Sequence, residues 1–181
     1  DINSGFITKI LGVDASASSF FVNGVQPNDG VINPLYGSYT GYTADKSYLK
    51  DNDDVRIFLY QDKSFWSDVF SWFDKTNVTA APNQEVNLNL NGYVSFFGCY
   101  PQETIEANTE AISDIKILSG TDKYDLKDTG IVTDNNGNFT LSFETPGKYF
   151  ISAESYSDDF TYIVLPWCEV TVEEENAETA S

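Results

Sequence analysis

The sequence contains no histidine and no methionine, and its one arginine is Arg56. Without histidine the chain lacks the general base of the common serine and cysteine triads, so hydrolases of those classes are excluded. The two cysteines, Cys99 and Cys168, have no histidine to complete a zinc site. A glycosidase would need two carboxylates across a cleft, and 28 acidic residues make some pair inevitable by chance. We therefore expect a protein that is not an enzyme, with no metal and no cofactor.

Long apolar runs and basic residues are also scarce. No stretch approaches the ~20 apolar residues that a membrane-spanning helix needs, so we expect no membrane insertion. Lysine and arginine together number 10 against 28 acidic residues, which gives a formal net charge of −18. A negative field of this size repels phosphate backbones, and this excludes nucleic acid as a partner.

What the chain does contain is enough apolar material to fold. Hydrophobic residues make up 41% and aromatic residues 15% of its 181 residues, which is too much for a disordered chain of this charge. The acidity, the Asn/Asp/Ser/Thr-rich loops and the cysteine usage are typical of exported proteins of Gram-positive bacteria. We expect a secreted or cell-surface monomer whose partner is an extracellular protein, a glycan or a small molecule.

Alternation and turn residues predict strands in the first part of the chain. Phe20-Phe21-Val22 leads into Asn23-Gly24, the dipeptide best suited to a tight hairpin, and Val55 to Tyr60 reads as a short strand. From Ser64 to Lys75 the apolar residues recur at helical spacing, with Ser64 as an N-cap. We expect a short helix there, although the same aromatic residues also fit a strand-rich segment.

The second part begins after a composition shift at residues 76–84 (TNVTAAPNQ). Residues 86–90 alternate apolar and Asn side chains, which predicts a half-buried strand. Residues 139–143 and 149–153 alternate on either side of Pro146-Gly147, which predicts a hairpin. The predicted domains are residues 1–80 and 81–174, followed by a tail at 175–181 (ENAETAS).

Three motifs in order resemble the domain family related to the C-terminal domain of transcobalamin. They are GFITKI (5–10), FFVNGVQPNDG (20–30) and YLKDNDDVRIFLY (48–60). The glycine that this family has in its "kdGD" turn is replaced by Asn52. The resemblance implies a β-grasp-like domain. Because the family's first strands precede the GFITKI segment, we expect this domain to be incomplete.

The second half resembles immunoglobulin-like or prealbumin-like modules of bacterial adhesins. The resemblance is carried by a "G-x-V-T-D-x-x-G-x-F" hairpin at Gly130 to Phe139 and a "PG-x-Y-x-I-x-A" hairpin at Pro146 to Ala153. It implies an Ig-like β-sandwich. The expected fold is therefore mainly β, an incomplete β-grasp-like domain followed by an Ig-like β-sandwich.

The two cysteines fall in the second predicted domain. Cys168 shares the parity of Val170 and Val172, which places it on the apolar face of the last strand. A disulfide to Cys99 would join the first strand region to the last, worth ~4 kcal/mol in the chain-entropy description. Strand parity puts Cys99 on the opposite face unless a bulge at a nearby glycine shifts it. A disulfide and a pair of buried thiols therefore both stay open.

Five aromatic residues are candidates for ligand binding. Tyr36, Tyr39 and Tyr42 lie in a Gly/Ser/Thr-rich loop of the kind that lines adaptable binding surfaces, although a plain surface loop also fits. Trp66 and Trp72 belong to an aromatic cluster that would serve either as a stacking platform or as core packing. We expect a non-enzymatic extracellular binding, adhesion or spacer module, and the alternative is a binder of a corrinoid or a glycan. A ligand binder should gather these rings around a pocket, whereas a spacer should bury or scatter them.

Overall fold

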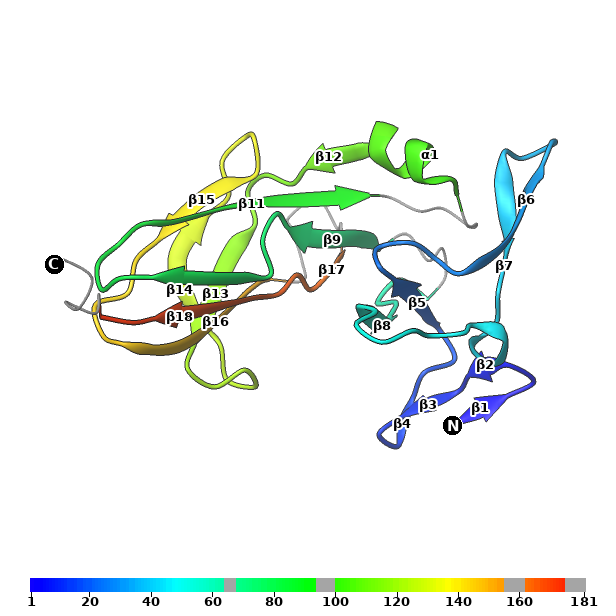
Figure 1. Ribbon diagram of the computed structural model, residues 1–181, viewed down its shortest axis with the longest axis horizontal. Coiled ribbons are helices and arrows are strands. Elements are labelled where there is room, and N and C mark those ends of the chain that lie inside the picture. The colour runs from blue at the N-terminus through cyan, green and yellow to red at the C-terminus, as the bar shows by residue number, and fades with distance from the viewer. Residues whose placement is uncertain (64–67, 94–99, 155–161, 175–181) are drawn as a thin grey trace, which may run out of the picture. The chain divides into compact units, whose positions relative to one another are not determined.

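The computed structural model describes residues 1–63, 68–93, 100–154 and 162–174. The chain forms two compact units (Figure 1). Unit 1 comprises residues 1–68 and 94–109, and unit 2 comprises residues 69–93 and 110–181. The predicted boundary near residue 80 assigned residues 69–80 to the first domain, whereas they belong to unit 2.

Unit 1 consists of short strands paired two by two, and the prediction of a mainly β chain is confirmed. The two-stranded sheets are β1-β2, β3-β4, β5-β8 and β6-β7, all antiparallel. Unit 1 thus has four separate two-stranded sheets, and its relationship to a β-grasp-like domain stays a prediction. Its elements are β1 (Ile2–Asn3), β2 (Phe6–Ile7), β3 (Lys9–Ile10), β4 (Val13–Asp14), β5 (Ser18–Val22), β6 (Asn28–Asn33), β7 (Ser38–Gly41), the 3-10 helix η1 (Ala44–Lys46), β8 (Val55–Leu59) and α1 (Gln102–Ala107).

The hairpin predicted at Asn23-Gly24 is confirmed. Asn23 and Gly24 have φ values of 53° and 79°, the left-handed region that a two-residue hairpin turn requires at both positions. The Val22 N–H donates to the Val25 carbonyl at 2.8 Å, and the Val25 N–H returns a bond to the Val22 carbonyl at 3.2 Å. The second turn of this region also uses a positive φ, because Asn52 has φ 72°.

Unit 2 is a sandwich of two sheets. One sheet has the order β10-β18-β16-β13-β14, and the other has the order β12-β11-β9-β17, with β15 paired to β11. The strands are β9 (Val69–Phe73), β10 (Asn77–Ala80), β11 (Val86–Tyr93), β12 (Thr109–Ala111), β13 (Lys116–Gly120), β14 (Lys127–Val132), β15 (Asn138–Leu141), β16 (Gly147–Ala153), β17 (Ile163–Val164) and β18 (Cys168–Val172).

The order of these strands is that of an Ig-like sandwich. The chain crosses from one sheet to the other after β9, β10, β12, β14, β15, β16 and β17, as the Greek-key connections of Ig-like domains require. At the corner between β15 and β16 the Tyr149 hydroxyl donates to the Thr145 carbonyl at 2.9 Å. A tyrosine bonded back to a carbonyl a few residues upstream, at this corner, is the tyrosine corner of Ig-like domains.

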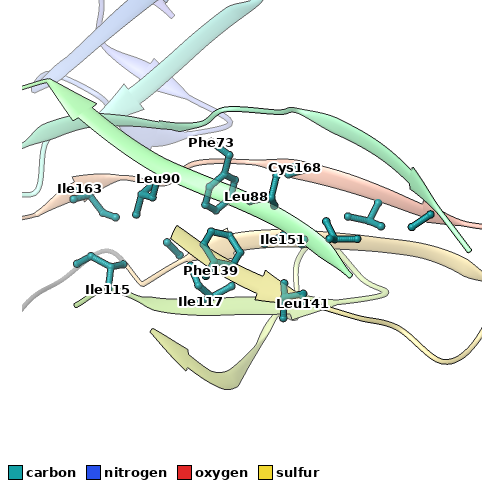
Figure 2. Packing of buried hydrophobic residues seen from close by; sticks show 14 of the residues in the cluster. Phe73, Leu88, Leu90, Ile115, Ile117, Phe139, Leu141, Ile151, Ile163 and Cys168 are labelled. Carbon is teal, nitrogen blue, oxygen red and sulfur yellow. The ribbon is translucent and has the colours of Figure 1, made fainter. Parts of the chain in front are cut away.

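The core of unit 2 lies between the sheets and is made of alternate residues from both (Figure 2). The alternation predicted for residues 86–90 is confirmed, because Val86, Leu88 and Leu90 are buried. The rings of Phe73 and Phe139 lie 5.3 Å apart, which links two strands of the same sheet. The buried members are Val69, Phe73, Ala80, Val86, Leu88, Leu90, Ile115, Ile117, Phe139, Leu141, Ile151, Ala153, Ile163, Cys168, Val170 and Val172.

Of the two alternatives for residues 64–75, the helix is wrong and the strand-rich segment is confirmed where they can be compared. Residues 64–67 lie outside the described part, and Val69–Phe73 form β9, which pairs with β11 (Phe70 opposite Tyr93, Trp72 opposite Asn91). Both faces of β9 are largely buried, so its apolar residues do not alternate. A strand that is buried on both faces has a continuous run of apolar residues, and periodicity alone does not distinguish such a run from a buried helix segment.

The two hairpins predicted in the second half are also wrong, for one reason. β14 pairs with β13 and β15 pairs with β11, so the turn before Asn138 leads from one sheet to the other. β15 and β16 likewise lie in different sheets, on either side of Pro146-Gly147. The turn residues were identified correctly, but alternation does not distinguish a partner within the same sheet from one across the sandwich.

Candidate functional site

Two clefts in unit 1 adjoin each other at Tyr42. This residue follows β7, and its N–H donates to the Pro27 carbonyl at 2.7 Å, which holds the chain against the segment that follows the Asn23-Gly24 hairpin. Tyr42 is 39% exposed, and it lines both clefts together with Gln26 and Pro27. The hairpin turn therefore brings Gln26 and Pro27 beside Tyr42.

The first cleft has a volume of about 250 Å³. Ser19 and Gln26 meet at its wall, where the Gln26 side-chain amide donates to the Ser19 hydroxyl at 2.7 Å. Gly5 lines the same cleft and has φ 85°. A Cβ there would lie 2.3 Å from the Asp45 carboxylate, so only glycine fits this close approach. The lining residues are Gly5, Phe6, Ile7, Ser18, Ser19, Phe20, Gln26, Pro27, Gly41, Tyr42, Thr43 and Ala44.

The second cleft is larger, at about 380 Å³, and it carries the charged groups. Lys46, Lys50 and Asp53 line it. Asp53 accepts the Lys50 N–H at 2.7 Å and the Asn23 side-chain amide at 2.8 Å. These hydrogen bonds, the backbone one first, lower the pKa of Asp53. The cleft thus combines two ammonium groups, one fixed carboxylate and the rings of Tyr42 and Tyr48.

The predicted aromatic residues do not gather around these clefts. Tyr36 is 72% exposed in the turn between β6 and β7, and Tyr39 is half-buried in β7 opposite Ile32. Trp72 is half-buried in β9 of unit 2, with its ring 5.7 Å from that of Phe70. Trp66 lies outside the described residues. Of the predicted tyrosines, Tyr42 alone is among the cleft residues in the part of the chain that is described.

Sequence reasoning missed the polar residues of the site. Gln26, Lys46, Lys50 and Tyr48 line the clefts, and none was singled out. The Asn23-Gly24 signal could have identified Gln26, because a two-residue hairpin places the residues that follow it alongside those that precede it. The two lysines carry no comparable signal, since their position depends on how the loop after β7 folds back.

A second feature of unit 1 is an exposed apolar face on the β5-β8 ribbon. Directly opposed residues of an antiparallel pair share a face, and two such pairs are Phe20 with Ile57 and Val22 with Val55. Ile57 is 48% exposed. The opposite face of the ribbon packs inward, because Phe21 is buried and its ring stacks on Phe58 at 5.6 Å. We call Phe20, Val22, Val55, Ile57 and Leu59 the β5-β8 face.

Of the two cysteines, the structure describes Cys168. Cys168 is a free and fully buried thiol in β18, on the core side of its strand as its parity predicted. Burial raises its pKa to about 11, because the thiolate would lose its hydration. Cys99 lies outside the described residues, and Cys168 forms no disulfide in this structure.

The Asp- and Asn-rich turn before β15 is held by hydrogen bonds to its own backbone. Asp134 accepts the N–H groups of Asn136 and Asn138, both at 2.8 Å, and these bonds lower its pKa. Across the described ranges, no three Cys, Asp or Glu side chains lie close enough to hold a metal ion. None of the helices in those ranges is long and apolar enough to cross a membrane.

No family model, no curated protein and no solved structure matches this chain. The clefts at Tyr42 and the β5-β8 face are therefore interpreted from their own chemistry.

Proposed function

We propose that the chain is a non-enzymatic, extracellular binding module in which unit 1 contacts a partner protein and unit 2 supports it. One observation carries the proposal. Of the seventeen large hydrophobic side chains that are exposed among the described residues, fourteen belong to unit 1 and three (Tyr124, Val132, Leu165) to unit 2. Apolar side chains concentrated on one part of a soluble chain mark an interaction surface.

The β5-β8 face is the part of unit 1 that best fits a protein partner. Its five side chains are all apolar and lie side by side on one face of two paired strands. Protein interfaces place such residues at their centre and charged residues at their rim. At one end of the face, Asp54 forms an ion pair with Arg56 at 2.9 Å. The net charge of −18 makes two copies of the chain repel each other, which favours a different protein as the occupant.

An extracellular location and the family resemblances belong to the same proposal. The Ig-like strand order and the tyrosine corner of unit 2 suit a spacer that holds a binding unit away from a surface. The motifs in residues 5–60 support a relationship of unit 1 to the transcobalamin C-terminal-like domains. The acidic composition and the Asn- and Asp-rich turns are typical of exported bacterial proteins.

A bead-adhesion assay tests the proposal on the whole chain. Beads coated with the protein are applied to an array of extracellular matrix proteins, with albumin-coated beads as the reference. We expect specific adhesion to at least one protein, and we expect Val55→Ser/Ile57→Ser to reduce it at least about tenfold. The matched control is Val132→Ser, which changes an exposed valine of unit 2.

Two results would overturn this proposal. One is adhesion no greater than that of albumin-coated beads on every protein of the array. The other is adhesion that the double substitution and the control substitution change equally.

A second candidate function is favoured by the two clefts at Tyr42. Their volumes, about 250 and 380 Å³, suit one or two sugar rings better than a corrinoid ring. Calorimetric titration with a glycan panel and with cyanocobalamin compares the two ligands. A glycan bound here should lose most of its affinity in Tyr42→Ala, whereas heat signals that do not saturate with any ligand would eliminate this candidate.

A further inference from the structure

A groove on unit 2 combines aromatic rings with paired charges. It lies along the outer side of the sheet that contains β13, β16 and β18, and its volume is about 600 Å³. It belongs to neither feature of unit 1. The lining residues are Thr121, Asp122, Lys123, Tyr124, Lys148, Phe150, Trp167 and Glu169.

Strand parity explains why these rings face outward. Ile151 and Cys168 are opposed in the sheet, and both are fully buried in the core. Their neighbours Phe150 and Trp167 must therefore point to the other side of the sheet. The two rings stack on each other, with centroids 5.2 Å apart and planes inclined by 28°. They form one continuous, half-buried aromatic floor.

Gly120 lets the loop that lines the groove lie close against the sheet. It is paired with Phe150 across the sheet. A Cβ at this position would come within 3.0 Å of the Asp125 carbonyl and 3.4 Å of the Leu126 side chain. The missing side chain thus allows the loop after Gly120 to approach the strand that carries Phe150.

The loop after Gly120 supplies a third ring. The Asp122 carboxylate accepts the Tyr124 N–H at 2.9 Å, which fixes the turn. Tyr124 is 86% exposed, and the Lys123 ammonium lies 5.0 Å from the centre of its ring. An aromatic side chain is exposed to this degree only at a cost in hydrophobic free energy, which binding a ligand would recover.

The charges in the groove balance, unlike those of the whole chain. Lys148 pairs with Glu169 at 2.7 Å, and Lys123 and Asp122 supply one further charge of each sign. A neutral groove does not select a charged ligand. It offers flat rings together with strong hydrogen-bond donors and acceptors.

We propose that this groove binds a neutral oligosaccharide. The C–H faces of pyranose rings stack on the Phe150–Trp167 floor and on Tyr124, as apolar surfaces do on aromatic rings. Sugar hydroxyls both donate and accept hydrogen bonds, so the ammonium groups and carboxylates at the rim can bind them without a net charge on the ligand. This site lies outside unit 1, to which the proposed function assigns the partner.

The test is an NMR titration of the full chain with neutral hexasaccharides. Cellohexaose, xylohexaose, mannohexaose and hexa-N-acetylchitohexaose are each added to about 10 mM, a concentration that reveals even millimolar affinity. At least one should shift the Trp167 indole N–H signal saturably. Trp167→Ala and Tyr124→Ala should each weaken that binding at least about tenfold.

The control substitution is Leu165→Ala, because Leu165 is 57% exposed close to Trp167 but does not line the groove. Its affinity should equal that of the unmodified chain. If Trp167→Ala fails to fold, Tyr124→Ala still decides the matter, because Tyr124 lies on an exposed loop and contributes little to the fold.

Three results would overturn the proposal. The first is no saturable shift with any of the four sugars, and the second is binding that both substitutions leave unchanged. The third is a decaproline peptide that binds the groove more tightly than any sugar, which would make it a peptide site. The bead assay depends on Val55 and Ile57 instead, so failure here leaves the proposed function of unit 1 standing.

Discussion

Units 1 and 2 are both built mainly from strands, yet they bury their apolar side chains differently. In unit 2, both sheets contribute alternate residues to one core, and side chains such as Leu90, Ile117 and Ile151 are fully buried. In unit 1, the paired strands form separate two-stranded sheets, and strand side chains such as Phe6 and Val31 are 66% and 67% exposed. Alternation gives a strand an apolar face, but only a second layer turns that face into a core.

The largest expected effect compares two leucines that differ in burial. Leu90→Ala in unit 2 should lower the free energy of unfolding by about 3 kcal/mol, because it leaves a cavity in a closed core. Leu35→Ala in unit 1 should change it by less than about 0.5 kcal/mol. Urea denaturation followed by circular dichroism measures both. Equal effects would show that unit 1 has a core as well packed as that of unit 2.

The next effect concerns Cys168 and alkaline pH. Its pKa is raised to about 11 in the folded chain, so the unfolded chain loses this proton at lower pH. Between about pH 9 and 11 the unfolded state then binds fewer protons, and the stability of unit 2 should fall by about 2 kcal/mol. Urea denaturation of the reduced chain across this range measures the decrease.

Cys168→Ala is the control for that decrease, because it removes the titrating thiol from the same core position. Its stability should depend less steeply on pH than that of the unmodified chain. Identical slopes would contradict a free, buried thiol at Cys168.

A smaller effect compares two tyrosine hydroxyls. Tyr149→Phe removes the hydrogen bond to the Thr145 carbonyl and should cost about 1 kcal/mol in the unfolding of unit 2. Tyr39→Phe in unit 1 should change stability by less than about 0.5 kcal/mol, as is usual away from such a feature. Thermal denaturation of the two variants gives the comparison, and a neutral Tyr149→Phe would argue against a structural tyrosine corner.

The smallest effect uses one asparagine from each unit. Asn52 and Asn83 have φ values of 72° and 62°, a region that glycine occupies with less strain. Asn52→Gly and Asn83→Gly should each stabilise the chain by about 0.5 kcal/mol. Amide hydrogen exchange locates each gain, which should fall in unit 1 for Asn52→Gly and in unit 2 for Asn83→Gly. Protection that rises in both units together would show that they unfold as one.

Local signals predicted the local structure of both units. The Asn23-Gly24 turn, the alternation at Val86 to Leu90 and the inward face of Cys168 follow from rules on single turns and strands. Partner choice between strands was not predictable in this way. The segments around Asn138 and Pro146 have the turn residues of hairpins, yet each connects two sheets, because pairing depends on which distant strand is adjacent.

The candidate sites were harder to predict for the same reason. Tyr42 was identified from its loop composition, but Lys46 and Lys50 reach the cleft only because the loop after β7 folds back. Phe150 falls in the predicted segment 149–153 and Trp167 directly precedes Cys168, so their outward parity was available from Ile151 and Cys168. The sequence did not show that β16 and β18 are neighbouring strands. Their pairing is what allows the Phe150 and Trp167 rings to stack on each other.

The parallel pairing of β10 with β18 has a mechanical consequence. Asn77 to Ala80 run alongside Glu169 to Val172, and further backbone bonds join Thr76 to Glu169 and Ala80 to Glu173. Tension applied between residue 69 and residue 173 would pull these two strands in opposite directions along their length. All the bonds of the pair would then resist together in shear, rather than open one after another as in a zipper. Unit 2 is thus arranged to bear a load across β10 and β18.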